Sequence, residues 1–440
     1  MKRPNIIFIV ADDLGFADLG CYGGRDAAFG KVSPVLDQLA ANGLKFSDGY
    51  ANSPVCSPTR FGLMTARYQY RLRGAAEEPI NSKARTSTTL GLPTTHPTLP
   101  SLLKEQGYRT ALIGKWHLGY PPAFGPLRSG YDEFFGPMAG GVDYFTHCAS
   151  TGAHDLWVGE EEQPHEGYLT DLISNKSVDY VKRMAQNTTQ PFFLSMHYTA
   201  PHWPWETRED HALAQSIKDN IFHLQGGNIH TYHRMIHHMD EGIGWVVNAL
   251  RETGQLDNTL IVFTSDNGGE RFSDNWPLVG GKMDLTEGGI RVPWIAHWPE
   301  GIAKPGSTTA QHCMTMDWSA TLVDVGGGKA HPDYPFDGVS LKPLLSNPDA
   351  TFARPLYWRM NHRGQRALRS GDWKYLRVDG NDYLFNVVAD ARERANLAKQ
   401  EPDRLEAMRS EWERWHSTMP PIPEDATISL GFSVKDMPQR

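Results

Sequence analysis

The sequence predicts an α/β protein built on a large, mostly parallel sheet sandwiched by helices, followed by a small antiparallel sheet with one helix. Short apolar runs rich in Val, Ile and Phe predict fully buried strands. Helical segments alternate with these runs, which is typical of a parallel sheet. Residues 351–440 differ, because short strand patterns separated by turns precede a single helix there.

The strands and helices of the larger region are expected at defined positions. Strands are predicted at residues 5–11, 110–113, 192–197, 259–265 and 293–298, and helices at 34–42, 99–106 and 229–252. Ser33 is the expected N-cap of the first helix, and Gly43 its stop. The strands at 5–11 and 259–265 run directly into acidic or amide residues. In such sheets ligands bind beyond the carboxyl ends of the strands, so we expect a site there.

The C-terminal region is expected to form a second, smaller domain. Strands are predicted at 367–368, 373–378 and 383–386, with Gly–Asp and Asp–Gly turns between them, and a helix at 402–416. We therefore divide the chain into an α/β domain, residues 1–350, and a small α+β domain, residues 351–440. The stretch after Pro420 has the composition of a loose tail.

Composition narrows the class of protein. A net charge of −8 in 440 residues argues against a nucleic-acid binder, which normally carries a basic face. No apolar run is long enough to cross a bilayer, and the first strand begins too early to leave room for a signal peptide. We expect a cytoplasmic protein, or a periplasmic or secreted one if a leader has been trimmed. The four cysteines are scattered and predict no disulfide framework.

The most specific segment of the chain surrounds Cys56. Elsewhere such a cysteine is usually a small buried hydrophobe. Here it opens the sequence CSPTR, which ends at Arg60. This CxPxR pattern resembles the signature of the type I sulfatases, in which the cysteine is converted to formylglycine. The match extends to Gly62 and Thr65.

Further blocks resemble the same family in the same order: PNIIFIVADDLGFADLG at 4–20, GKWHLG at 114–119, APHWP at 200–204, TSDNGG at 264–269 and GGK…EGGIRVP at 280–293. The resemblance spans nearly the whole chain. It is nearest to the arylsulfatase and N-acetylgalactosamine-sulfatase-like branch of the alkaline phosphatase superfamily. It implies an alkaline-phosphatase-like fold and a sulfuric ester hydrolase that depends on a maturation enzyme for its formylglycine.

Four hard oxygen donors follow the two strands described above. They are Asp12, Asp13, Asp266 and Asn267. Three carboxylates in one place repel one another unless a cation neutralises them, and oxygen ligation indicates Ca²⁺, or Mg²⁺, rather than zinc. The converted Cys56 is expected to join them as a ligand. The alternative is turn and cap chemistry, since Asp and Asn favour strand ends.

Cleavage of a sulfate ester needs a nucleophile at sulfur, positive charge near the sulfate oxygens and an acid for the leaving alcohol. A hydrated aldehyde at position 56 supplies one hydroxyl to attack and a second whose collapse expels sulfate. Arg60, Lys115 and Lys282 are candidate cations. The resemblance implies that His202, with Lys282, faces the leaving group and that His117 deprotonates the second hydroxyl. Either histidine alone is equally compatible with a hydrogen-bonded core residue.

Other polar and aromatic residues are less specific. The segment GVDYFTH, ending at His147, resembles a stretch that contacts sulfate in the same branch. The histidines on the long helix are interpreted as a polar face at a substrate entrance, not as a metal site, and Asp240 and Glu241 as a solvated helix face. Aromatic side chains near His202 suit stacking on sugar rings or simple core packing. The histidines and the tryptophans are His230, His233, His237 and His238, and Trp203, Trp205, Trp276 and Trp298.

Two other functions fit parts of the pattern. A hydrolase of phosphonate monoesters or phosphodiesters belongs to the same superfamily, although Lys115 and Lys282 stand where two-metal phosphatases need metal ligands. A non-catalytic binder of sulfated glycans would be expected to have lost at least one reacting residue. The expected partner is a small-molecule or carbohydrate sulfate ester, with no nucleic acid and no membrane.

Overall fold

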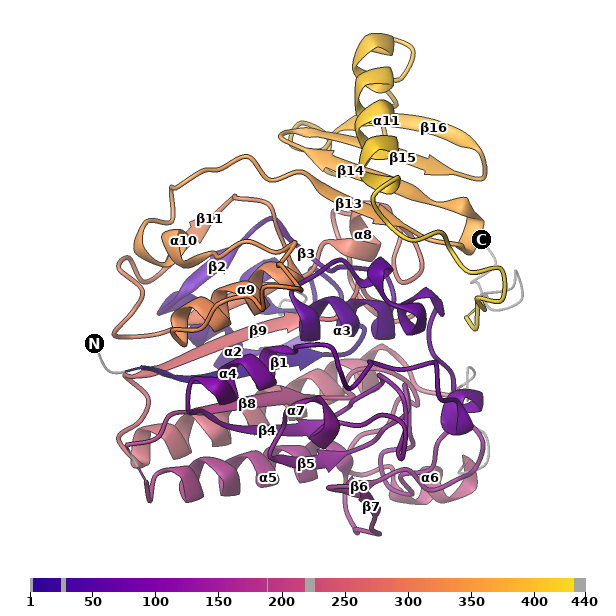
Figure 1. Ribbon diagram of the computed structural model, residues 1–440. Coiled ribbons are helices and arrows are strands. Elements are labelled where there is room, and N and C mark those ends of the chain that lie inside the picture. The colour runs from indigo at the N-terminus through magenta and orange to yellow at the C-terminus, as the bar shows by residue number, and fades with distance from the viewer. Residues whose placement is uncertain (1–2, 25–28, 188, 218–225, 431–440) are drawn as a thin grey trace.

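The computed structural model describes residues 3–24, 29–187, 189–217 and 226–430, and these residues form one large sheet and two smaller ones (Figure 1). The large sheet has ten strands in the order β11-β2-β10-β9-β1-β8-β4-β5-β6-β7. In that order the strands are Ser307–Thr309, Leu44–Phe46, Trp294–His297, Thr259–Ser265, Asn5–Ala11, Phe192–His197, Arg109–Gly114, Glu133–Gly136, Trp157–Val158 and Glu161–Glu162. A separate two-stranded sheet pairs β3 (Gly49–Tyr50) with β12 (Cys313–Met314).

The centre of the large sheet is parallel. β1 lies between β9 and β8, parallel to both, and β4 continues the parallel run beyond β8. β10 is antiparallel to β9 and to β2, and β6 is antiparallel to β5 and β7, so the sheet is mixed at its sides. The predicted α/β class is therefore confirmed, and five neighbouring strands, β9, β1, β8, β4 and β5, send their carboxyl ends to one edge.

Helices cover both faces of this sheet, because its central strands are apolar on both sides. In β1, Ile7 and Ile9 pack in the core beneath α2, α5 and α7, whereas Ile6 and Phe8 pack in the core beneath α3, α4, α9 and α10. The helices are α2 Pro34–Ala41, α3 Cys56–Thr65, α4 Leu99–Glu105, α5 Leu169–Met184, α6 His211–Ile217, α7 Ile229–Glu252, α8 Glu287–Ile290, α9 Thr315–Val325, α10 Lys342–Ser346 and α11 Pro402–His416. Short 3₁₀ turns lie at Gly20–Tyr22, Gln69–Arg71, Arg73–Ala76, Ser82–Thr86, Leu127–Ser129 and His362–Gly364.

The C-terminal sheet is a four-stranded antiparallel meander with α11 packed on it, as expected. Its strands are β13 Leu356–Arg359, β14 Arg366–Ser370, β15 Trp373–Val378 and β16 Asn381–Asn386. A buried charge network fastens it to the large unit. Lys374 on β15 lies 2.9 Å from the carboxylates of both Glu287 and Glu393, and Tyr50 donates to the second oxygen of Glu287. The division into domains near residue 350 stays a prediction.

The interpretation of Asp240 as a solvated residue is wrong. Its carboxylate is buried and accepts hydrogen bonds from the backbone N–H groups of Val35 and Leu36, at 2.9 and 2.8 Å. It therefore caps the start of α2 from the neighbouring helix α7. Ser33 occupies the N-cap position, but its hydroxyl bonds Asp37 and accepts from the N–H of Gly20 instead.

The prediction of a loose tail after Pro420 is also wrong for residues 421–430, while 431–440 lie outside the described residues. The backbone of residues 427–429 pairs with Glu78 by two hydrogen bonds of 2.9 Å, one from the N–H of Glu78 to the carbonyl of Thr427 and one from the N–H of Ser429 to the carbonyl of Glu78. Three prolines lie at or near the start of this stretch, at positions 420, 421 and 423, so its own composition gives no sign of the pairing.

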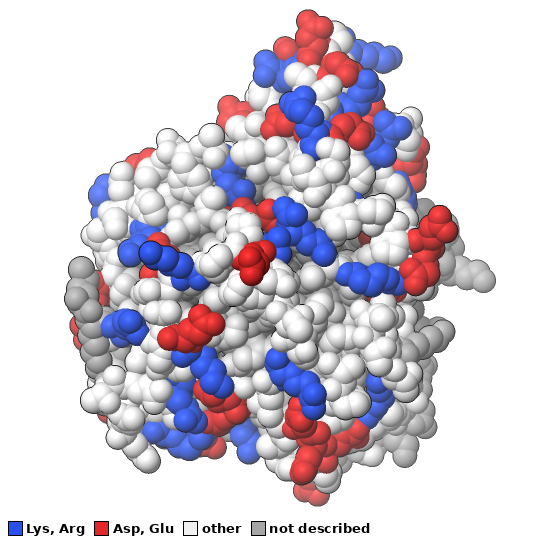
Figure 2. Space-filling view, viewed as in Figure 1, with Lys and Arg blue, Asp and Glu red and all other residues white. Residues whose placement is uncertain are grey.

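The distribution of charged side chains and the apolarity of the helices agree with the expectations from composition. Figure 2 shows Lys and Arg side chains interspersed with Asp and Glu over the viewed face, most densely on the C-terminal sheet and α11. Across the described helices, none is both long and apolar enough to span a bilayer. The four cysteines are free, which confirms that no disulfide framework is present.

Candidate active site

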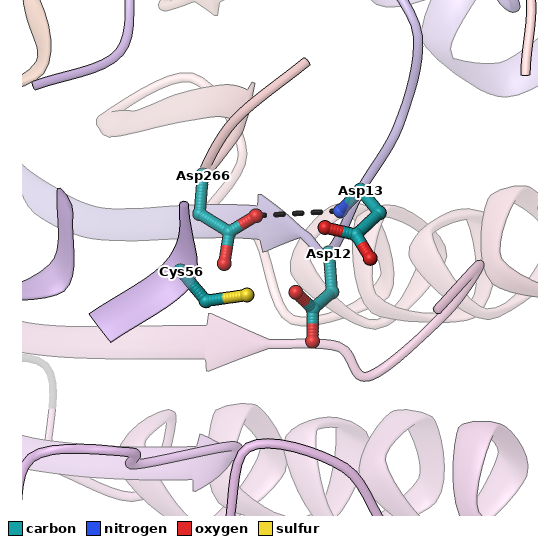
Figure 3. Close-up of side chains that lie close together, drawn as sticks. All are labelled: Asp12, Asp13, Cys56 and Asp266. Atoms are coloured by element: carbon teal, nitrogen blue, oxygen red, sulfur yellow. Dashed lines mark hydrogen bonds between the residues drawn. The ribbon is translucent and has the colours of Figure 1, made fainter. Parts of the chain in front are cut away.

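Residues from four adjacent strand ends and one helix meet at the carboxyl edge of the large sheet. Asp12 and Asp13 follow β1, and Asp266 and Asn267 follow β9. The strands β8 and β4 lead into the loops that carry His202 and the pair Lys115 and His117. The helix α3 begins at Cys56 and brings its thiol to the same point (Figure 3).

The acidic cluster is compact and buried. One ligand atom each from Asp12, Asp13, Cys56 and Asp266 lie within 4.8 Å of one another (Figure 3). Burial, together with the neighbouring Asp12, raises the pKa of Asp266 to about 7. The pKa of Asp13 falls well below its usual value, because Lys282 and His202 outweigh the effect of burial. Such a set of carboxylates is strained by its own charge unless cations balance it.

The donor set fits a hard divalent cation. Asp12 Oδ1 and Asn267 Oδ1 are buried and have no hydrogen-bond partner among the described residues. The amide nitrogen of Asn267 donates to Asp13 Oδ1 at 2.7 Å, so the orientation that leaves its oxygen unpartnered is fixed. Buried oxygens without partners cost free energy, and oxygen-only ligation suits Ca²⁺ or Mg²⁺.

The residues around Cys56 hold its side chain at the first turn of α3. Thr59 closes the preceding turn by accepting from the N–H of Ser53 and donating to its carbonyl, at 2.9 and 2.8 Å. The Cys56 side chain is buried, and burial raises the pKa of its thiol well above the usual value. An unmodified thiol here is mostly protonated and therefore a poor nucleophile.

Three buried cations surround the carboxylates. Arg60 donates from Nε and Nη2 to Asp266 Oδ2, at 3.1 and 2.9 Å, and Lys115 Nζ donates to Asp12 Oδ2. Lys282 Nζ donates to Asp13 Oδ2 at 2.6 Å. Burial alone would lower the pKa of Lys282, but Asp13 and the other acidic groups hold it well above its ordinary value. Of the three, Lys282 lines the open cavity, and Arg60 and Lys115 lie behind it.

The two candidate proton carriers are held as neutral rings with defined tautomers. His202 Nδ1 donates to the carbonyl of Trp203 at 2.6 Å, which leaves Nε2 3.6 Å from Asp13 Oδ2. His117 Nε2 donates to the carbonyl of Ile80 at 2.6 Å, which leaves Nδ1 as the acceptor. Burial, with Lys282, lowers the pKa of His202 to about 3, and burial, with Lys115, lowers that of His117 well below its usual value.

A pair of glycines packs flat against these two rings. A Cβ atom on Gly140 would lie 2.4 Å from His117 Cε1, and one on Gly141 would lie 2.9 Å from His202 Cε1. No side chain larger than hydrogen fits at either position without moving a histidine.

The cavity above Cys56 has a reacting end and an uncharged end. Its volume is about 80 Å³. Cys56, His117, His202 and Lys282 form the reacting end, and the remaining lining residues carry no charge: Pro79, Ile80, Asn81, Ser82, Ala139, Gly140, Gly141, Ser150, Trp203, Ser429 and Leu430.

Several predicted residues lie elsewhere. His147 is buried within its own loop, where its N–H donates to the carbonyl of Asp143 at 3.1 Å, and it is not among the described residues that line the cavity. On α7, His233 and His238 are buried, which corrects the expected polar face at these two positions. Among the described residues, the acidic cluster is the one group of metal-ligand spacing, so the histidines of α7 form no such site.

Sequence reasoning missed other contributors. Glu270 follows the predicted TSDNGG block directly and lies 3.5 Å from Lys282 Nζ, with a pKa raised to about 7 by burial. Its position directly after that block was an available signal. Asn81 and Ser429 carry no such signal, because neither belongs to any of the blocks.

Comparison with known proteins agrees with this geometry. Human N-acetylgalactosamine-6-sulfatase is 33% identical over 366 residues, which are 78% of this chain and 66% of that protein. Mouse arylsulfatase J is 29% identical over 484 residues, covering 96% of this chain and 77% of its own length. The chain thus spans about two thirds of the length of the human relative.

Solved structures share the fold. The crystal structure of Ps i-CgsB in complex with k-i-k-neocarrahexaose superposes with a TM-score of 0.82 at 34% identity, covering 94% of this chain and 93% of that one. The phosphonate monoester hydrolase of Agrobacterium radiobacter superposes with a TM-score of 0.65 at 19% identity, covering 94% of this chain and 96% of that one. At this identity the match shows a shared fold and nothing about activity. The family model for sulfatases matches residues 4–328. The chain belongs to the sulfatase family.

Proposed function

We propose that this protein hydrolyses the sulfate ester of a carbohydrate or another small organic alcohol, using a formylglycine made from Cys56 and one divalent cation. The observation that carries the proposal is that ligand atoms of Cys56 and three buried carboxylates lie within 4.8 Å of one another. Cys56 also lines a cavity that is lined by two histidines and Lys282. Each part of this arrangement has a separate task in sulfate transfer.

The cation would be held by Asp12, Asp13, Asp266 and Asn267, together with the modified residue 56. When bound, Ca²⁺ or Mg²⁺ polarises the oxygens that coordinate it and offsets the charge of the carboxylates. Arg60 and Lys115 each pair with one of these carboxylates, so they orient the ligands as well as balance their charge.

Conversion of Cys56 explains how so deeply buried a thiol takes part in the chemistry. As an aldehyde hydrate, the residue supplies one hydroxyl for attack on sulfur and a second that allows sulfate to leave by cleavage of the C–O bond. A maturation enzyme that generates formylglycine is the required partner. His117 Nδ1 faces no protein partner among the described residues and is placed to accept a proton.

His202 and Lys282 assist the departure of the alcohol. Both line the cavity, and both contact Asp13. A pKa of about 3 makes His202 neutral near pH 7. The negative charge of a bound sulfate favours the imidazolium form, so we expect His202 to become an acid as substrate binds.

The polarity of the cavity lining supports a small sugar or organic sulfate. Its alcohol end is uncharged and includes one tryptophan and several hydroxyl or amide groups, which suits a hydroxylated ring. Relatives are named for N-acetylgalactosamine 6-sulfate, and a related structure holds a carrageenan oligosaccharide.

The test is expression with and without a formylglycine-generating enzyme, followed by peptide mass analysis and rate measurement. The Cys56 peptide should become lighter by the difference between –CH₂SH and –CHO, and hydrolysis of 4-nitrophenyl sulfate should rise with the modified fraction. Cys56→Ala should be inactive, whereas Cys313→Ala, at another buried cysteine, should retain activity. Full activity from protein with only free thiol at Cys56 refutes the proposed nucleophile. Faster cleavage of an aryl phosphodiester than of the aryl sulfate refutes the proposed substrate class.

A further inference from the structure

The uncharged end of the cavity is closed by a stretch of chain far from the catalytic blocks. Ser429 and Leu430 line the cavity together with Asn81 and Ser82. These residues come from two segments, 77–82 and 425–430, that lie side by side. Ser82 is also hydrogen-bonded to Ser150, another lining residue, with 3.1 Å between the two hydroxyl oxygens.

Backbone pairing fixes the 425–430 segment to its neighbour. In addition to the two bonds with the backbone of Glu78, the N–H of Thr427 donates to the carboxylate of Glu77 at 3.1 Å. Arg73 forms an ion pair with Asp425 at 3.0 Å. The backbone of Ser429 is therefore held by contacts that do not involve its own side chain.

The 77–82 segment is in turn fixed to the reacting residues. The N–H of Ile80 donates to the hydroxyl of Ser57, next to the nucleophile, at 2.9 Å. The carbonyl of Ile80 accepts from His117 at 2.6 Å. Asn81, the next residue, is thus held in register with both Cys56 and His117.

We propose that Asn81 and Ser429 form a subsite that binds the hydroxyl groups of the alcohol moiety, on the assumption that the proposed sulfatase function is correct. Asn81 Nδ2 donates to Ser429 Oγ at 2.8 Å. Because Ser429 Oγ accepts this bond, its own O–H is oriented away from Asn81 and donates to a ligand oxygen. Trp203 lies on the same cavity and offers an apolar face to the ring.

The chemistry of this subsite selects a class of substrate. The cations lie at the reacting end of the cavity, where they can bind one sulfate group. The subsite itself carries no charge, so it offers no binding partner to a second sulfate. We infer a preference for a neutral, hydroxylated ring with a single sulfate over an aromatic alcohol of similar size. An aryl ring without hydroxyl groups presents no hydroxyl to Ser429, so it gains no binding free energy from Asn81 and Ser429.

Ser429→Ala tests the subsite, with neutral monosaccharide monosulfates and 4-nitrophenyl sulfate as probes for the formylglycine-bearing enzyme. The variant should lose about five- to tenfold in kcat/KM on the best sugar sulfate, mainly through KM, since one neutral hydrogen bond is lost. On 4-nitrophenyl sulfate it should stay within about twofold of the wild type. Ser429→Thr retains the hydroxyl and should restore most of the sugar activity. Ser410→Ala, at a half-buried serine of α11 that does not line the cavity, is the matched control.

The outcomes separate the two proposals. A wild type that hydrolyses 4-nitrophenyl sulfate but none of the sugar sulfates refutes the carbohydrate assignment, and the subsite with it. If the wild type hydrolyses sugar sulfates, the behaviour of Ser429→Ala tests the subsite alone. The subsite is refuted if the variant loses the same factor in kcat/KM on both substrates, or if it loses nothing on the sugar sulfate. Equal thermal unfolding temperatures for the wild type and Ser429→Ala confirm that a selective loss is local.

Discussion

Replacement of Gly140 by alanine should disable the enzyme by moving a single ring. The added Cβ would lie 2.4 Å from His117 Cε1 and 2.6 Å from Nε2. Carbon atoms in contact prefer a separation of about 3.5 Å, so the imidazole has to move by about 1 Å. The bond from Nε2 to the carbonyl of Ile80 is now 2.6 Å long. A shift of about 1 Å along it would exceed hydrogen-bonding distance.

The size of the effect follows from that displacement. A misplacement of about 1 Å at a reacting group costs on the order of 100-fold in rate. We expect a loss of that order in kcat for 4-nitrophenyl sulfate, measured on protein with the same formylglycine and metal content as the wild type. The matched control is Gly244→Ala on α7, where the new Cβ meets a Val35 methyl carbon at 3.0 Å, away from the cavity, and should leave kcat unchanged.

One result would refute this reasoning. If Gly140→Ala keeps kcat within about threefold of the wild type, the position of the His117 ring does not limit the reaction. A crystal structure of the variant would then show whether the ring stayed or the backbone moved in its place.

Three further predictions concern stability and metal. Asp240→Ala should lower the free energy of unfolding by about 1–3 kcal/mol, because two backbone N–H groups at the start of α2 lose their acceptor; urea denaturation measures this, with exposed Asn248→Ala as control. Lys374→Met should cost about 3–5 kcal/mol in the same assay, since the buried carboxylate of Glu287 loses its nearest cation; an unchanged midpoint would contradict the assigned role of this pair. Removal of the cation with EDTA should abolish hydrolysis until Ca²⁺ or Mg²⁺ is restored. Elemental analysis should find less bound metal in Asp12→Asn than in the wild type. Stoichiometric zinc in active protein would contradict the assignment of Ca²⁺ or Mg²⁺.

The strands that deliver the reacting residues could be predicted because each is a local pattern. β8 and β9 match their expected bounds, Phe192–His197 and Thr259–Ser265, and so does the long helix α7. A buried parallel strand is a continuous apolar run, and that signal requires no knowledge of its neighbours. The polar residue that follows such a run is placed by the same logic, which explains why the acidic cluster could be anticipated.

The missed features depend on partners far away in sequence. α5 was not predicted, because it buries Ser174 and Ser177 where an apolar stripe would be expected. Asp240 has the surroundings of a solvated helical residue, yet its two partners lie more than 200 positions earlier in the chain. The contact between Thr427 and Glu77 spans 350 residues. No pattern within either segment encodes such a contact.

The attachment of the 425–430 segment through main-chain bonds has a consequence for how such an enzyme changes over evolution and in the laboratory. Amide and carbonyl groups are the same for every residue other than proline, so the side chain of Ser429 is able to vary while the segment stays in place. The reacting groups, by contrast, are bonded to one another through their side chains and tolerate little change. Diversification of position 429 should therefore yield variants that differ in the alcohol they accept while sharing one chemistry.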